Sequence, residues 1–151
     1  MYHVQRSTVV PYRASEMYAL VADVESYPEF LPWCRWVEVH LREGERVRAT
    51  VEVSRGPLRQ AFTTENRLVQ DRTIEMRLAS GPFRHLYGVW LFEPAGDGGC
   101  RVTLDLEFDF STRVMSLTLG PLFNEVTRQM IDAFRTRAVQ IYGTGYTATE
   151  A

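Results

Sequence analysis

The residues best suited to chemistry, histidines and cysteines, are few and scattered in this sequence. His3, His40 and His85 lie on separate predicted strands, and nothing resembles the short His and Cys spacings of metal sites. Cys34 and Cys100 are far apart and outside any C-x-x-C motif, and Cys34 is predicted to be a buried, unreactive thiol. The sequence also lacks a G-x-S-x-G nucleophile motif and a glycine-rich phosphate loop. We therefore expect no catalytic residue, no metal and no cofactor, and a role that is not enzymatic.

One arginine stands in an otherwise apolar pattern. Arg137 falls on the apolar side of a predicted C-terminal helix, between Met130 and Ile141. A charged group at such a position must be paired or must reach water. Three interpretations are open: an ion pair with an acid on the sheet, a side chain that snorkels past the end of the sheet, or a donor to the polar head group of a ligand.

A second unusual segment is rich in aromatic residues and is interrupted by prolines. Pro28 and Pro32 restrict it to a short helix near residues 28–31 followed by a loop. Exposed aromatic side chains on such a loop would act as a lid over a cavity mouth or as a wedge into a bilayer. The alternative is a hydrophobic plug that closes one end of the sheet. The residues concerned are Tyr27, Phe30, Leu31, Pro32 and Trp33.

Most of the chain before residue 111 is predicted to be β-strand, because apolar and polar residues alternate with a period of two. Tight turns separate the later strands, which predicts antiparallel neighbours. A short helix is expected from about Ser15, as N-cap, to Val24. The predicted strands are residues 2–10, 35–42, 47–53, 58–69, 74–78, 84–93 and 100–110.

The long helix predicted from Arg113 to Tyr142 is the element that must cover this sheet. From Pro121 onward it would be ~33 Å long, at 1.5 Å per residue. Arg128, Asp132 and Arg135 lie on its polar side, and a break or kink is expected at Gly120–Pro121. Its apolar side carries Met115, Leu119, Leu122, Phe123, Val126, Met130, Phe134 and Ile141.

One helix laid on a curved sheet does not fill the whole concave face, so we predict an α+β fold with an apolar small-molecule cavity between sheet and helix. The alternative is that the same side chains simply pack as a core. The predicted cavity residues are Phe62, Met76, Phe83, Trp90, Phe92, Phe108, Leu122, Phe123, Val126, Met130 and Arg137.

Length and composition set further limits. With 151 residues, 45% of them hydrophobic, and a net charge of −2, the chain is predicted to form one globular domain over residues 1–143, followed by a flexible tail at 144–151. The charge argues against DNA or RNA binding driven by bulk positive charge. No secretory signal pattern and no apolar run of ~20 residues is present. We expect a cytoplasmic protein and leave transient contact with the inner-membrane surface open.

Three segments of the sequence stand out together: SYPEFLPWC (26–34), SGPFRHLYGVWLFEP (80–94) and LFNEVTRQMIDAFRTRAVQIYG (122–143). In this order they resemble a known family, the coenzyme Q-binding START-like proteins. Bacterial members of the family are also described as ribosome-association toxin A or as polyketide cyclase/dehydrase-like proteins. The resemblance implies a helix-grip fold, similar to START and Bet v proteins, with about seven strands wrapped around the C-terminal helix and a hydrophobic tunnel.

The resemblance also implies a function. The favoured hypothesis is that the protein binds and chaperones ubiquinone or a polyprenyl precursor without acting on it, in support of quinone biosynthesis and respiration. A quinone oxygen would then be the head group that Arg137 could contact. A less favoured hypothesis is a ribosome-directed toxin that blocks the joining of ribosomal subunits. A third is an aromatic polyketide cyclase or dehydratase, which would need an acid or base in the cavity.

Overall fold

The computed structural model describes residues 1–144, and it contains all seven predicted strands and the long C-terminal helix. The predicted tail at 144–151 lies, apart from residue 144, outside the described residues. No helix within residues 1–144 is long and apolar enough to span a bilayer. In chain order the elements are β1 (Tyr2–Val10), α1 (Ala14–Ala22), the 3-10 helix η1 (Val24–Ser26), α2 (Tyr27–Phe30), β2 (Cys34–Glu43), β3 (Arg46–Arg55), β4 (Leu58–Val69), β5 (Thr73–Ser80), β6 (Phe83–Ala95), β7 (Gly99–Phe110) and α3 (Arg113–Tyr142).

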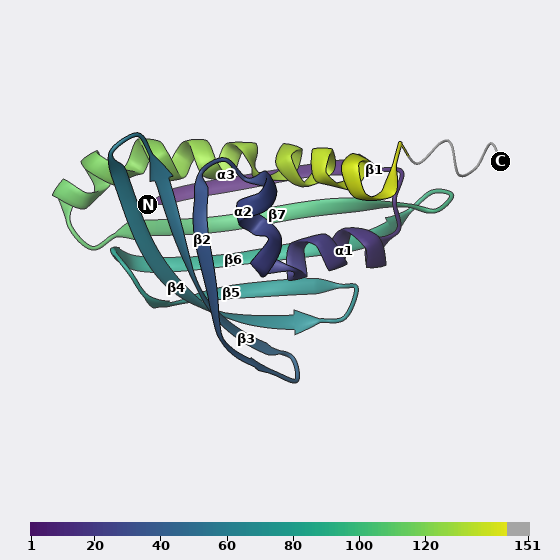
Figure 1. Ribbon diagram of the computed structural model, residues 1–151, viewed down its shortest axis with the longest axis horizontal. Helices are drawn as coiled ribbons and strands as arrows, with labels where there is room; N and C mark the ends of the chain where they lie inside the picture. Colours follow the sequence, from purple (N-terminus) through teal and green to yellow (C-terminus); the bar gives the residue numbers. More distant parts are fainter. Residues whose placement is uncertain (145–151) are drawn as a thin grey trace.

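The strands form one antiparallel sheet in the order β1-β7-β6-β5-β4-β3-β2. Consecutive strands from β2 to β7 are neighbours, as the tight turns predicted, and β1 pairs with β7, where Val4 lies opposite Leu106. Register shifts occur in β2, between β4 and β5, and at the start of β6. Such irregularities bend strands and increase their twist. Figure 1 shows the result, a sheet so curved that β2 and β3 run across the direction of β6 and β7.

Helix α3 lies along the concave side of the sheet, close to β1 and β7 (Figure 1). Its first turn is capped by Thr112, whose Oγ1 accepts a hydrogen bond from the Met115 N–H at 3.1 Å. The helix runs without a break to Tyr142, so the break that was one of the two alternatives at Gly120–Pro121 does not occur. Pro121 is on the exposed side, where water can solvate the carbonyl that lacks a helical donor. Gly120 serves close packing instead, since a Cβ there would lie 2.6 Å from the Tyr2 hydroxyl.

The buried side of α3 drifts around the helix and leaves one predicted apolar position outside. Thr127, Ile131, Phe134 and Ala138 are all buried, and these positions recur about every 3.6 residues. The next position in that series is 142, so Ile141 lies to one side and is 52% exposed. The predicted place of Ile141 on the apolar, buried side of the helix is therefore wrong.

The short helices cover the part of the sheet beside α3 (Figure 1). Helix α1 begins one residue before Ser15, so the predicted N-cap is wrong. Arg13 takes that position because Glu16 supplies the acceptor: the Arg13 backbone N–H donates to Glu16 Oε1 at 2.9 Å. The Tyr142 hydroxyl donates to the Glu16 carbonyl at 3.0 Å and ties the end of α3 to α1.

The outer face of β7 is polar, as its alternation predicted. Asp105 and Asp109 lie on this face with Glu107, while the residues between them are buried. His3 Nε2 lies 2.6 Å from Asp105 Oδ1. Arg84 donates to Asp109, and this hydrogen bond holds the pKa of the Asp109 carboxyl below its usual value. These acids are therefore surface groups with partners and take no part in the concave face.

Candidate ligand-binding site

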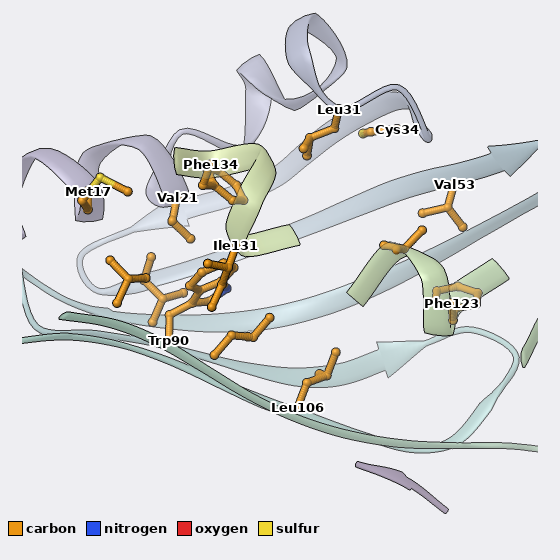
Figure 2. Close-up of a cluster of buried hydrophobic side chains, with 14 of the residues drawn as sticks. Met17, Val21, Leu31, Cys34, Val53, Trp90, Leu106, Phe123, Ile131 and Phe134 are labelled. Atoms are coloured by element: carbon orange, nitrogen blue, oxygen red, sulfur yellow. The ribbon is translucent and has the colours of Figure 1, made fainter. Parts of the chain in front are cut away.

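An apolar cavity of about 100 Å³ lies between the curved sheet and α3. Figure 2 shows four of its residues, with Trp90 and Leu106 on β6 and β7, and Val53 and Phe123 on β3 and α3. An enclosed, mainly apolar space is the usual form of a small-molecule site. The lining residues are Val24, Tyr27, Trp33, Ala49, Val51, Val53, Phe62, Thr64, Asn66, Met76, Leu86, Trp90, Leu106, Phe123, Val126, Thr127 and Met130.

Six of the predicted cavity residues line this space, and they come from both the sheet and helix α3. The sheet contributes Phe62, Met76 and Trp90. Helix α3 contributes Phe123, Val126 and Met130. The amphipathic patterns therefore identified residues from both walls.

Three predicted aromatic residues do not line the cavity but pack as core. Phe83 and Phe108 form a cluster with Phe123, with ring centroids 5.0 and 6.2 Å from its ring. Phe92 lies between Trp90 and Tyr18 of α1, with centroids 6.3 and 5.7 Å away. Because α3 and α1 press directly on the sheet at these places, the rings meet one another and leave no space.

The sequence interpretation missed nine lining residues, for two reasons. Most are aliphatic residues of the same alternating strands, and alternation cannot tell which inward residues border a space. Thr64, Asn66 and Thr127 are polar, and a search for apolar positions passes over them. The nine are Val24, Ala49, Val51, Val53, Thr64, Asn66, Leu86, Leu106 and Thr127.

The aromatic segment at residues 27–33 folds inward over one side of the cavity. Tyr27 and Phe30 both pack edge-on against Phe134 of α3, with centroids 5.4 and 5.3 Å away. Leu31 is buried in the core, and Tyr27 and Trp33 line the cavity. This placement favours a lid or plug over a wedge into a bilayer, because four of the five predicted side chains point into the protein and only Pro32 is exposed.

A surface groove of about 310 Å³ lies outside this segment. Trp33 and Val126 border both the groove and the cavity, so these two side chains form the partition between them. The Trp33 carbonyl accepts a hydrogen bond from the Ser54 N–H at 2.8 Å, which fixes the segment to the end of β3. The remaining groove residues are Pro32, Ser54, Arg55, Gly56, Leu122, Glu125 and Gln129, so Leu122, predicted for the cavity, lines the groove instead.

Arg137 does not line the cavity, because it is engaged with the aromatic segment. Its Nη2 donates to Glu29 Oε1 at 3.0 Å, and its guanidinium lies 4.8 Å from the centre of the Phe30 ring. The predicted ion pair is present, but the acid is on α2 and not on the sheet. The Arg137 side chain is 16% exposed while that of Glu29 is 64% exposed, so screening by water limits the pair to at most about 1 kcal/mol.

Cys34 has the character predicted from the sequence, and Cys100 shares it. Both are buried and free, and burial raises the pKa of each thiol to about 11. At neutral pH both are therefore protonated and poor nucleophiles. Within residues 1–144 no group of His, Cys, Asp and Glu side chains has the arrangement of a metal site.

Comparison with known proteins places this geometry in context. Residues 10–135 match the family described as "Polyketide cyclase / dehydrase and lipid transport". "Ribosome association toxin RatA" of Pseudomonas aeruginosa is 48% identical over 141 residues, which cover 93% of this chain and 98% of that protein. "Coenzyme Q-binding protein COQ10 homolog B, mitochondrial" of Xenopus laevis is 31% identical, over 91% of this chain and 58% of that protein.

The solved structures agree on the fold. A START superfamily protein from Mycobacterium smegmatis matches with a TM-score of 0.78 at 18% identity, over 93% of this chain and 99% of that one. The predicted seven-stranded helix-grip fold and the predicted family resemblance are both confirmed. The chain belongs to the polyketide cyclase/dehydrase and lipid transport family, whose START-like fold encloses the cavity described above.

Proposed function

We propose that this protein binds a hydrophobic isoprenoid quinone, either ubiquinone or a polyprenyl precursor, and that it thereby supports quinone biosynthesis and respiration. The observation that carries the proposal is the apolar cavity enclosed between α3 and the sheet. Membership of a family whose description includes lipid transport supports a lipid ligand. A relative whose name states coenzyme Q binding supports a quinone in particular.

The proposed role is binding without catalysis. Tyr27 is the one titratable residue among the cavity-lining residues of the described chain. Its hydroxyl donates to the Val21 carbonyl, and burial raises the pKa of the phenol far above its usual value, so it stays neutral. A cyclase or dehydratase needs a positioned acid or base that can exchange protons with its substrate. The cavity wall therefore favours a carrier over an enzyme, although the family description includes both.

A quinone would have to enlarge the cavity in order to enter. Sites for drug-sized ligands measure ~300–1,000 Å³, and even benzene is known to occupy a cavity of ~150 Å³. The cavity of about 100 Å³ is too small alone, but displacement of Trp33 would join it to the groove of about 310 Å³. The head group would then lie inside and the first isoprene units along Pro32 and Leu122. The Arg55–Glu125 ion pair beside the groove is largely exposed and would resist opening only weakly.

The direct test is the identity of lipid that accompanies the protein. We expect native mass spectrometry of the purified chain to show a bound quinone or prenylated phenol, and a ubiquinone with a shortened tail to bind when added. The same quinone or prenylated phenol should be recovered when the protein is purified in mild detergent, which removes membrane lipid that is not specifically bound. Recovery of no such lipid, together with no binding of added ubiquinone, would contradict the proposal.

Ribosome association is a second candidate, because a relative with 48% identity carries that name. The charges on the surface do not favour RNA binding through bulk positive charge. Two arginines of β2 and β3 are paired with acids: Arg48 lies 2.9 Å from Glu65, and Arg42 lies 2.9 Å from Glu25. With a net charge of −2 as well, binding to RNA would depend on local shape more than on bulk charge.

Sucrose-gradient profiles after overexpression would test this second candidate. A protein that blocks subunit joining should lower the amount of assembled ribosomes and raise the amounts of free subunits. Unchanged profiles at high expression would contradict it. Gln129→Arg, a change confined to the groove, shows whether the groove surface contributes to any effect.

A further inference from the structure

The cavity contains one buried polar atom that lacks a hydrogen-bonding partner. The Asn66 side chain lies in the cavity wall, and the residue is 8% exposed. Within residues 1–144, its Oδ1 is the only fully buried side-chain nitrogen or oxygen that makes no hydrogen bond. Buried polar groups are paired in the great majority of cases, and an exception needs an explanation.

The register of the sheet turns the Asn66 side chain toward the cavity, so Asn66 is not a surface residue. Asn66 follows Phe62 and Thr64 at intervals of two on β4, and all three line the cavity. Its neighbours on the adjoining strands are Val47 and Met76, which are apolar. Asn66 also borders a smaller lobe of about 20 Å³ next to the cavity, so it lies where the two spaces meet.

Asn66 therefore weakens the folded protein unless something pairs with it. An unpaired buried acceptor loses its hydrogen bonds to water on folding and gains none in return. An aliphatic side chain of the same size would suit this apolar position better. The arrangement makes physical sense if a ligand supplies the missing donor.

We propose that Asn66 is the head-group anchor of the cavity, and that its Oδ1 accepts a hydrogen bond from a hydroxyl group of the ligand. This inference rests on the proposed function and makes it more specific. An oxidised quinone offers only acceptor oxygens, whereas a hydroquinone or a prenylated phenol offers an O–H donor. The Asn66 Nδ2 group can donate to either form, but Oδ1 can pair only with an O–H group, so we expect the cavity to bind the phenolic or reduced form of an isoprenoid quinone more tightly than its oxidised form.

The test compares three compounds with the same short prenyl tail: a hydroquinone, the corresponding quinone and the dimethyl ether of the hydroquinone. Affinities are measured without oxygen, on the full-length wild type and on Asn66→Leu. We expect the wild type to bind the hydroquinone about 3 to 10 times more tightly than either other compound, the value of one buried hydrogen bond. In Asn66→Leu this preference should disappear.

The same variant gives a second readout that needs no ligand. Removal of the unpaired amide should raise the Tm of the ligand-free protein by about 2 to 4 °C. Asn124→Leu is the matched control, because it makes the same substitution on α3 outside the cavity wall. It should keep the preference for the hydroquinone and should not raise the Tm of the ligand-free protein.

The outcomes separate the inference from the proposed function. If the wild type binds none of the three compounds, the proposed function is contradicted. If it binds all three equally, or if Asn66→Leu keeps the wild-type preference, only the role of Asn66 is contradicted. A fall in Tm for Asn66→Leu would also count against the anchor, since it would mean that Asn66 already has a stabilising partner.

Discussion

Val126→Arg should abolish binding of an isoprenoid quinone while the protein stays folded. Val126 is 4% exposed and lies in the partition between cavity and groove. An arginine there would place its stem across the entry route and its charge beside an apolar site, at a cost of several kcal/mol to any apolar ligand. We expect at least a roughly 100-fold loss of affinity, measured by tryptophan fluorescence or calorimetry with a short-tailed ubiquinone. The groove gives the guanidinium a path to water, so folding should survive.

Two further variants make this result interpretable. Gln140→Arg puts the same charge on an exposed position of α3 outside both the groove and the cavity, and should bind ligand within a few-fold of the wild type. Val126→Phe blocks the same partition without a charge, and should also reduce binding strongly. Wild-type affinity in both Val126 variants, with circular dichroism showing folded protein, would mean that the ligand does not use this cavity.

Phe134→Ala should cause a large loss of stability. Phe134 is 1% exposed, and its ring touches three others, with centroids 5.4 Å from Tyr27, 5.3 Å from Phe30 and 5.4 Å from Trp90. It therefore joins α3, the aromatic segment and β6. Deletion of a buried phenylalanine ring costs about 3–5 kcal/mol, since the space left behind collapses only in part. Equilibrium unfolding in urea measures this loss directly.

Ile141→Ala is the matched control on the same helix. The sequence pattern places Ile141 and Phe134 on one apolar face, but Ile141 is 52% exposed. Its truncation should change the free energy of unfolding by no more than about 0.5 kcal/mol. Similar losses in both variants would show that α3 is rotated relative to the packing described above.

The strands and the long helix were predictable because their periods are set by local geometry. Cys100, Val102, Leu104 and Leu106 alternate with polar residues, and β7 follows that alternation with its apolar side buried. The ends of α3 were also predicted correctly, at Arg113 and Tyr142. The continuity of the helix through Pro121 was not, because whether a proline breaks a helix depends on which side of the helix faces water.

The division between cavity and core was not predictable from periodicity. Phe62 lines the cavity and Phe108 packs in the core, although both are inward-facing aromatic residues on strands. The difference comes from where the curved sheet meets α3 closely and where it does not. Curvature depends on register shifts such as the one between Thr63 and Thr64, which alternation does not reveal.

The partners of polar groups were not predictable from the sequence either, as Arg137 and Asn66 show. The sequence indicated that a charge at Arg137 needs a partner, but only the folded chain brings Glu29, 108 positions away, to within 3.0 Å. Asn66 looks like an ordinary polar strand residue in the sequence, and only the sheet register turns it toward an apolar cavity with no partner. The sequence by itself thus determined the elements, the family and the apolar character of the concave face. The tertiary structure decided which groups meet there, because partner choice depends on contacts between segments far apart in the chain.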